Sequence, residues 1–291
     1  MSIKDHALLV SLNVGKPQLT AKDAKATFDA ELANNASGAG QYRKDLYPKS
    51  LVAPILAVES AARAYIENTT YPWNRGENLL PVTRFMEFTD RIGKYQIEFD
   101  QAVTAFLNNW TGVMAQAQQQ QGTMFDPGSY PDVSDLRSDF RFRIAYRPVT
   151  DAGDFRVQLQ EDDLNTVRAA VEEQVRESTN EMLRAPLERL RSVVARLHEV
   201  AGKTDRVVDG SKGVQVKAPI FRDSVVENIS EEIALLHDFA DMLPDTHLAL
   251  AKQVADALPH PQQLRDDPVQ RSETRKNMGD LLAQINGMLG E

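Results

Sequence analysis

The sequence predicts a mainly α-helical protein of the α+β class, in which long antiparallel helices pack with a small antiparallel β-sheet. Apolar residues recur every three or four positions along residues 82–119 and 161–201, which is the spacing of a helix with one buried face. Residues 140–147, FRFRIAYR, instead alternate strictly, as a half-buried strand does. No Ser/Gly-rich linker divides the chain, so we expect residues 1–291 to form a single domain.

The predicted sheet is built from short segments near the start and the middle of the chain. HALLVSLNVGKPQL, residues 6–19, is rich in β-branched residues and is closed by the turn residues Gly15 and Pro17, so it predicts a strand. FRFRIAYR and the later FRVQL predict a hairpin over residues 140–159 with a rather long loop. The N-terminal strand can add to this hairpin.

The first half of the chain contains three predicted helices. Residues 20–33 have Thr20 as a candidate N-cap and Asp23 at the capping-box position. A second helix is predicted over 51–67, with Ser50 as its cap. The third, over 82–119, has the strongest apolar stripe and is stopped by Gly122. Such a stripe can pair two chains in a coiled coil or pack inside one chain, and we favour the second arrangement.

The second half is also predicted to be helical. Pro186 lies inside the helix over 161–201 and predicts a kink near 182–186 or two abutting helices. Residues 203–217 are polar and contain glycine, which predicts an excursion hairpin or a mobile loop. Three further helices complete the chain, the last with Asp267 as N-cap and Pro268 at its first position: 221–242, 246–258 and 268–289.

Composition excludes several kinds of chemistry. The chain has no cysteine, which excludes disulfides, thiolate metal sites and a cysteine nucleophile and fits a reducing cytoplasm. Its net charge is −9, and because residues 1–150 carry equal numbers of basic and acidic side chains, the whole excess lies in residues 151–291. An acidic surface repels phosphate backbones. No apolar run approaches the roughly 18 residues of a membrane span, and the N-terminus lacks signal-peptide features.

The common catalytic motifs are also missing from the sequence. There is no GxxxxGK[ST], no GxGxxG and no GxSxG, so nothing predicts a phosphate loop or a nucleophile elbow. None of the five histidines stands in an HExxH arrangement, and we expect structural or surface roles for them: His6, His198, His237, His247 and His260. We therefore predict no catalytic residue, no metal and no cofactor. An enzyme with dispersed carboxylates remains an alternative.

An arginine-rich strand face is the first candidate interaction surface. Arg141, Arg143 and Arg147 alternate with aromatic and aliphatic residues, and Arg137 stands just before them. Guanidinium groups at this spacing can follow a phosphate backbone or bind an acidic partner. The alternative is a solvated strand face, paired with the acidic second half of the chain. We favour the solvated face.

A tryptophan-containing corner is the second candidate. In NTTYPWNRGENLLP, residues 68–81, Asn68 is predicted to end a helix in a left-handed conformation and Gly76 to supply a positive φ. We expect Trp73 to pack as a lid between the two flanking helices, with Arg75 held against a carboxylate or helix-end carbonyls. Trp73, Arg75 and Gly76 thus define a candidate interaction corner, for which a rigid buried structure is favoured over a ligand site.

Several motifs carry a resemblance to a known family. They are RKDLYPK (43–49), ARAYIENTTYPWNRGENLLP (62–81), MFDPGSYPDVSDLRSDFRFRIAYRPVTDAGDFRV (124–157), FRDSVVENI (221–229) and, more weakly, LRDDPVQR (264–271). The chain resembles an uncharacterised family of tailed-phage and prophage proteins, catalogued as a domain of unknown function. Residues 203–218 look like an insertion relative to that family. The genes of the family often lie near MoxR/CobS-like AAA+ ATPases and von Willebrand A-type proteins.

The resemblance implies an accessory protein that acts in the cytoplasm of an infected bacterial host. The expected function is a non-enzymatic adaptor or self-assembling scaffold, with the AAA+ ATPase, the von Willebrand A-type protein or further copies of the chain as partners and no membrane partner. The alternative is a nucleic-acid-binding recombination or replication accessory protein that uses the arginine face. Proximity of genes gives no physical evidence of function. The choice between these functions therefore depends on the arrangement and charge of particular residues.

Overall fold

The computed structural model describes residues 3–74, 76–150, 161–203, 206–210, 213–217 and 221–290, and the side chains of 161–166, 206–210 and 213–217 are outside that description. The chain divides into two compact units. Unit 1 consists of residues 1–9, 69–85 and 147–291, and unit 2 of residues 10–68 and 86–146. Each unit is discontinuous in the sequence, so no linker of distinctive composition separates the two units. The sequence therefore predicts a single domain where the structure has two compact units.

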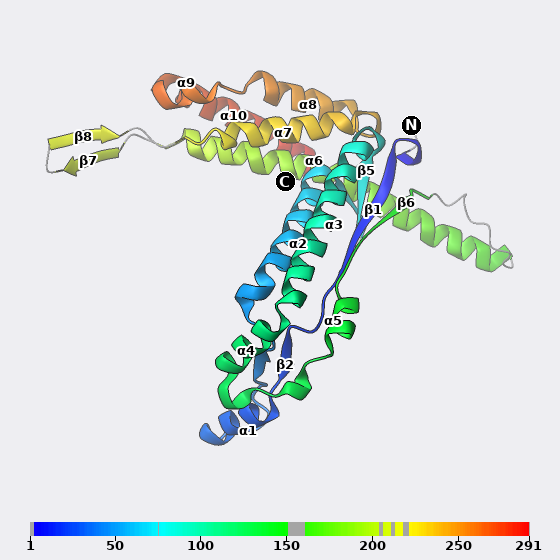
Figure 1. The fold of residues 1–291 in the computed structure, drawn as a ribbon. Coiled ribbons are helices and arrows are strands. Elements are labelled where there is room, and N and C mark those ends of the chain that lie inside the picture. Colours follow the sequence, from blue (N-terminus) through cyan, green and yellow to red (C-terminus); the bar gives the residue numbers. More distant parts are fainter. Residues whose placement is uncertain are drawn as a thin grey trace. The chain divides into compact units, whose positions relative to one another are not determined.

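The mainly helical α+β class is confirmed, because helices predominate around a small antiparallel sheet (Figure 1). The sheet has the strand order β4-β5-β1-β6. The predicted N-terminal strand and the arginine-rich strand are both present, and they are neighbours in this order. The predicted FRVQL strand lies outside the described residues. The four strands are β1 (Ala7–Gly15), β4 (Tyr71–Asn74), β5 (Glu77–Pro81) and β6 (Arg141–Pro148).

Unit 1 is a stack of helices around one hydrophobic core. Helix α6 packs against α7 and α10, and α8 packs against α7 and α10 (Figure 1). The strand β4 packs on α6 and contributes Tyr71 and Trp73 to the same core. The α-helices are α6 (Glu161–Ala201), α7 (Ser224–Asp238), α8 (Asp245–Asp256), α9 (Pro261–Asp266) and α10 (Pro268–Leu289).

Three predictions for unit 1 can be compared with this arrangement. Helix α6 runs continuously through Pro186, so the alternative of two abutting helices is wrong. Asp267 caps α10 by accepting hydrogen bonds from the backbone N–H groups of Val269 and Gln270, as predicted. The segment predicted as a hairpin or a loop forms the two-stranded antiparallel hairpin β7 (Arg206–Gly210) and β8 (Gly213–Lys217).

Unit 2 is built on two long helices and a small hairpin. Helices α2 and α3 lie side by side (Figure 1), and Tyr65 of α2 stacks on Phe88 of α3 with ring centroids 5.8 Å apart. The apolar stripe of α3 is buried inside the chain, which confirms the intrachain arrangement. The elements are β2 (Thr20–Lys22), α1 (Ala24–Ala33), β3 (Arg43–Asp45), α2 (Lys49–Thr69), α3 (Phe85–Asn108), α4 (Trp110–Gln121) and α5 (Val133–Asp139).

Several predicted boundaries in unit 2 are wrong, for local reasons. The first helix begins at Ala24, because Thr20–Lys22 pairs with Arg43–Asp45 as a strand and Asp23 takes the N-cap position. Helix α2 continues past Asn68, which is therefore not a left-handed terminus. Asn109 leaves helical geometry and separates α3 from α4. The apolar stripe continues into α4, so periodicity alone could not reveal this break.

Short 3-10 turns complete the described structure: Ile3–Asp5, Val82–Arg84, Gly122–Met124, Pro127–Ser129 and Ala240–Met242. Gly122 ends α4 with a φ of 53°, as predicted for a stop. Among the residues that the structure describes, no helix is both long enough and apolar enough to span a bilayer.

Candidate functional site

The arginine face of β6 is exposed as predicted. Arg141 and Arg143 are exposed, and Phe142 between them is buried in the core of unit 2. Arg141 uses its Nε to donate to the carbonyl of Ser138 at 3.1 Å, and Arg137 donates to the Thr104 hydroxyl at 3.1 Å. Within the described part of the chain Arg143 forms no ion pair. The face therefore offers one unengaged guanidinium and two that are held by neutral partners.

Arg147, at the end of the same strand, has a different environment in unit 1. Its Nη1 lies 3.0 Å from Oε1 of Glu77, the first residue of β5. The Arg147 side chain is 66% exposed and that of Glu77 only 16%, so the guanidinium closes over a half-buried carboxylate. Arg147 is therefore partly neutralised and belongs to a separate local site.

The predicted tryptophan corner is a β-hairpin. Trp73 is buried in β4 and belongs to the core of unit 1, so it is a strand residue of that core and not a lid on a helix corner. Gly76 has a φ of +83°, which confirms the predicted positive φ in the turn between β4 and β5. Arg75 lies outside the described residues. The proline- and glycine-rich pattern predicts a buried Trp73, which the structure has, but it does not predict the paired strands β4 and β5.

A pocket of about 390 Å³ brings Trp73 and Arg147 together in unit 1. Its walls come from β1, β4 and β5, from the end of β6 and from α6. Leu9, Trp73, Val171 and Val175 supply apolar surface. Its other lining residues are polar or lie at the rim: Asn74, Glu77, Arg147, Pro148, Thr150, Gln174 and Ser178. Nothing local in the sequence marks this set, since its members are far apart along the chain.

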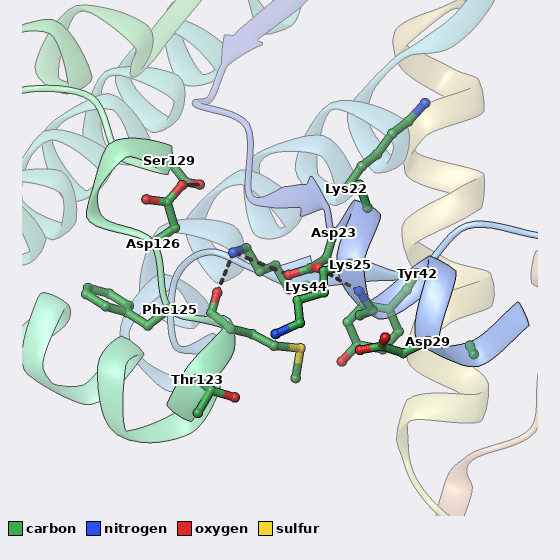
Figure 2. A pocket seen from close by; sticks show the side chains of 14 residues that line it. Lys22, Asp23, Lys25, Asp29, Tyr42, Lys44, Thr123, Phe125, Asp126 and Ser129 are labelled. Carbon is green, nitrogen blue, oxygen red and sulfur yellow. Dashed lines mark hydrogen bonds and ion pairs between the residues drawn. The ribbon is translucent and has the colours of Figure 1, made fainter. Parts of the chain in front are cut away.

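A larger pocket of about 690 Å³ lies in unit 2, between the β2–α1 junction, β3 and the turns after α4 (Figure 2). Lys44 of β3 is buried and donates to the carbonyl of Met124 at 2.5 Å. The same amine lies 3.6 Å from Oδ2 of Asp23. Lys22, in contrast, extends away from Asp23 and Lys44 (Figure 2). The burial of Lys44 was not predicted from the sequence.

Asp23 is held in its ionised form by this arrangement. A hydrogen bond from the backbone N–H of Ala26 lowers the pKa of Asp23, burial opposes that effect, and the charge of Lys44 lowers the pKa further. On the opposite wall, Asp126 accepts from the Gly128 backbone at 3.0 Å and from the Ser129 hydroxyl at 2.9 Å. These charged groups of the lining are therefore satisfied by partners within unit 2.

Helix α1, which borders the unit 2 pocket, has an apolar outer face. None of its residues is buried, and Phe28 and Leu32 are 63% and 66% exposed. Together with Ala24 they stand at successive spacings of four and share one side of the helix, the α1 face. Exposed apolar side chains that gather on one element mark interaction surfaces more often than scattered ones do.

Tyr71, Glu232 and Arg189 are titratable groups of unit 1 that contact one another. In the core of unit 1 the Tyr71 hydroxyl donates to Oε1 of Glu232 at 2.9 Å, and Arg189 lies over the Tyr71 ring. Burial raises the pKa of Glu232, although Arg189 and Tyr71 lower it. Burial also raises the pKa of Tyr71.

Three of the histidines have structural contacts, in agreement with the sequence analysis. The Nε2 of His247 lies 3.0 Å from the Leu183 carbonyl, the Nδ1 of His198 lies 2.8 Å from the Arg275 carbonyl, and His260 caps α9. In the part of the chain that the structure describes, no three His, Asp or Glu side chains are grouped as metal ligands.

Comparison with known proteins gives no relative from which a function could be transferred. No family model matches the chain, and neither a curated protein nor a solved structure matches it significantly. Any function must therefore be argued from the pockets and the exposed surfaces themselves.

Proposed function

We propose that this protein is a non-enzymatic adaptor that binds a protein partner through the α1 face of unit 2. One observation carries the proposal: α1 exposes Phe28 and Leu32 and buries none of its residues. Burying two such side chains in a partner contributes about 1.5–3 kcal/mol each. A helix that adds nothing to its own core is suited to such a contact.

The rest of unit 2 supports the proposal by holding α1 in place. Asp23 caps the helix through the backbone N–H of Ala26 and is paired with Lys44, which is itself tied to the carbonyl of Met124. The base of α1 is therefore ordered before any partner arrives. An ordered binding element loses less conformational entropy on association.

The resemblance noted above provides the proposed partners. A MoxR/CobS-like AAA+ ATPase comes first, with its von Willebrand A-type protein, and a second copy of this chain is the alternative occupant. The proposed setting is the cytoplasm of an infected bacterial host.

Co-expression with the ATPase and the von Willebrand A-type protein tests this proposal. Phe28→Ser together with Leu32→Ser is expected to abolish co-purification, because the apolar contact is lost. Met86→Ser with Ile97→Ser is the matched control, since these side chains of α3 are also exposed, at 79% and 59%. If both double variants co-purified equally with the partner proteins, the α1 face would not be the binding surface. Sedimentation velocity of the same variants identifies self-association.

The second candidate function is nucleic-acid binding, favoured by the exposure of Arg141 and Arg143 on β6. The pairing of Arg147 with Glu77 and the acidic balance of the chain weaken it. Fluorescence anisotropy with labelled single-stranded DNA at increasing salt tests it. If the face binds phosphates, Arg143→Ala should reduce the salt slope by about one. No binding at low salt would eliminate this candidate.

A further inference from the structure

We propose that the pocket of unit 1 lined by Trp73 and Arg147 is a binding site for a small organic carboxylate with an apolar body. The pocket lies between β1, β4, β5, the end of β6 and α6, and all of its lining residues belong to unit 1. The proposal is independent of the adaptor function, which concerns α1 of unit 2. The lining of the pocket has an apolar part, a hydrogen-bonding part and a charged part.

The apolar part of the pocket is built from three elements, β1, β4 and α6. Leu9 and Trp73 are 6% and 4% exposed and form one wall. Val171 and Val175 of α6 form another, and their spacing of four places them on one side of the helix. A volume of about 390 Å³ is within the range of ligand pockets. The surface suits a ring or a short aliphatic group.

The hydrogen-bonding part consists of the Ser178 hydroxyl and the indole N–H of Trp73. Ser178 is 4% exposed and follows Val171 and Val175 on the same side of α6, yet its hydroxyl forms no hydrogen bond within the described residues. The indole N–H of Trp73 likewise has no acceptor there. Both polar atoms keep contact with solvent, so a ligand in the pocket can replace water as their hydrogen-bond partner. Indole N–H can only donate, so the ligand must present an acceptor.

The charge part comes from Arg147. Its Nη1 is bound to Glu77, but the fork of a guanidinium carries five N–H donors and can hold a second carboxylate. The side-chain amides of Asn74 and Gln174 at the rim add further donors. Donors therefore outnumber the single charged acceptor, Glu77. A carboxylate fits this set, and Glu77 weakens its binding by repulsion.

Two-dimensional NMR of the indole N–H groups tests the proposal directly. The chain has two tryptophans, so Trp73 and Trp110 give two assignable signals, and Trp110→Phe identifies them. The probe is phenylacetate, and phenylacetamide is the uncharged control. We expect phenylacetate to shift the Trp73 signal saturably, to leave the Trp110 signal in unit 2 unchanged, and to bind more tightly than phenylacetamide.

Three variants sharpen the test because they are expected to act in opposite directions. Arg147→Gln should weaken phenylacetate binding by about tenfold or more, since a hydrogen bond to a charged group is lost. Glu77→Gln should tighten it, because the competing carboxylate is removed. Arg143→Gln, an exposed arginine on the same strand, should leave it unchanged.

The proposal is overturned by any of three results. One is a linear shift of both indole signals with no saturation, and another is equal binding of phenylacetate and phenylacetamide. The third is an equal effect of Arg147→Gln and Arg143→Gln. Circular dichroism verifies that each variant is folded. Should Arg147→Gln fail to fold, the sign of the Glu77→Gln effect decides, because tighter binding supports the proposal and unchanged or weaker binding refutes it.

Discussion

The polar groups that line these two pockets, one in each unit, differ in whether they have hydrogen-bond partners in the protein. In unit 2, Lys44 is shared between the Met124 carbonyl and Asp23, and Asp126 is bound by the turn that follows it. In unit 1, the hydroxyl of Ser178 and the indole N–H of Trp73 have no partner within the described residues. Lys44, Asp23 and Asp126 in the lining of the larger pocket are therefore bound to other groups of the chain. The smaller pocket retains hydrogen-bonding capacity, and for that reason the proposed ligand site is the smaller of the two.

The carboxyl groups of Asp23 in unit 2 and Glu232 in unit 1 also differ, in how well the protein stabilises their charged forms. Backbone N–H groups at the start of α1, with Ala26 the main donor, lower the pKa of Asp23. Burial raises the pKa of Glu232 in the core of unit 1, where one phenol and one arginine only partly compensate. A carboxylate at a helix N-terminus is stabilised by several aligned dipoles, whereas one against an apolar core loses hydration. The difference lies in the surroundings of each group and not in its residue type.

The largest expected loss of stability comes from a substitution in the apolar wall of the unit 1 pocket. Trp73→Ala should destabilise the protein by about 3–5 kcal/mol, because a buried indole is lost and a cavity remains. Urea unfolding followed by circular dichroism measures this loss. Phenylacetate binding should disappear in the same variant. A loss below about 1 kcal/mol would mean that Trp73 is exposed in solution, and the structural interpretation of the hairpin would then be wrong.

A second prediction concerns the satisfied charges of unit 2. Lys44→Met should cost about 1–3 kcal/mol, because the Met124 carbonyl loses its buried donor and Asp23 loses its cation. Lys22→Met is the control, since Lys22 is exposed and extends away from the pair (Figure 2), and it should cost less than about 0.5 kcal/mol. Thermal melting of the two variants makes the comparison. Equal melting temperatures would show that Lys44 is not held as described.

Much of the fold was predictable because it depends on local patterns. The alternation in β6, the long apolar stripes of α3 and α6 and the capped start of α10 all follow from residues within a few turns of one another. Strands β2 and β3 were missed because three residues are too few to show alternation. The hairpin β4–β5 was interpreted as a helix corner because Pro72 and Gly76 mark a turn without revealing what it joins.

The candidate sites were less predictable, since each joins residues that are distant in the sequence. The sequence singled out Trp73 and Arg147 separately, and their shared pocket depends on the packing of β4 and α6. Ser178 carried no signal, because a serine in a polar-rich helix is ordinary. A buried lysine such as Lys44 is rare, so residue type predicts exposure instead. The division into two units was hidden because strands and helices cross it without a linker.

A third prediction compares one glycine from each unit. Gly76 has a φ of +83°, so Gly76→Ala should destabilise the protein by about 1–3 kcal/mol through strain alone, as a Cβ there meets no atom within 4 Å. Gly93 lies in the interior of α3 with equally open space. Gly93→Ala should therefore stabilise by about 0.5–1 kcal/mol. Urea midpoints measure the change in stability of both variants. If both changes had the same sign, the positive φ assigned to Gly76 would be wrong.

The last and smallest effect is the pH dependence of Glu232. Its pKa in the folded protein is raised, so the folded state holds the proton more tightly than the unfolded chain does. Stability from this group is therefore fully present below the ordinary glutamate pKa of 4.5 and is lost as the pH rises through the raised value. Glu232→Gln imitates the protonated form and still accepts from Tyr71.

The variant Glu232→Gln should therefore be slightly more stable than the parent protein at pH 7, and the difference should vanish towards pH 4. Urea midpoints measured across this range isolate the effect, because all other groups titrate equally in both proteins. Glu231→Gln, which changes an exposed neighbour, serves as the control and should show a smaller change. A variant that is less stable at pH 7 would mean that attraction to Arg189 outweighs the loss of hydration. Glu232 would then resemble Asp23, and the contrast between the two carboxyl groups would fail.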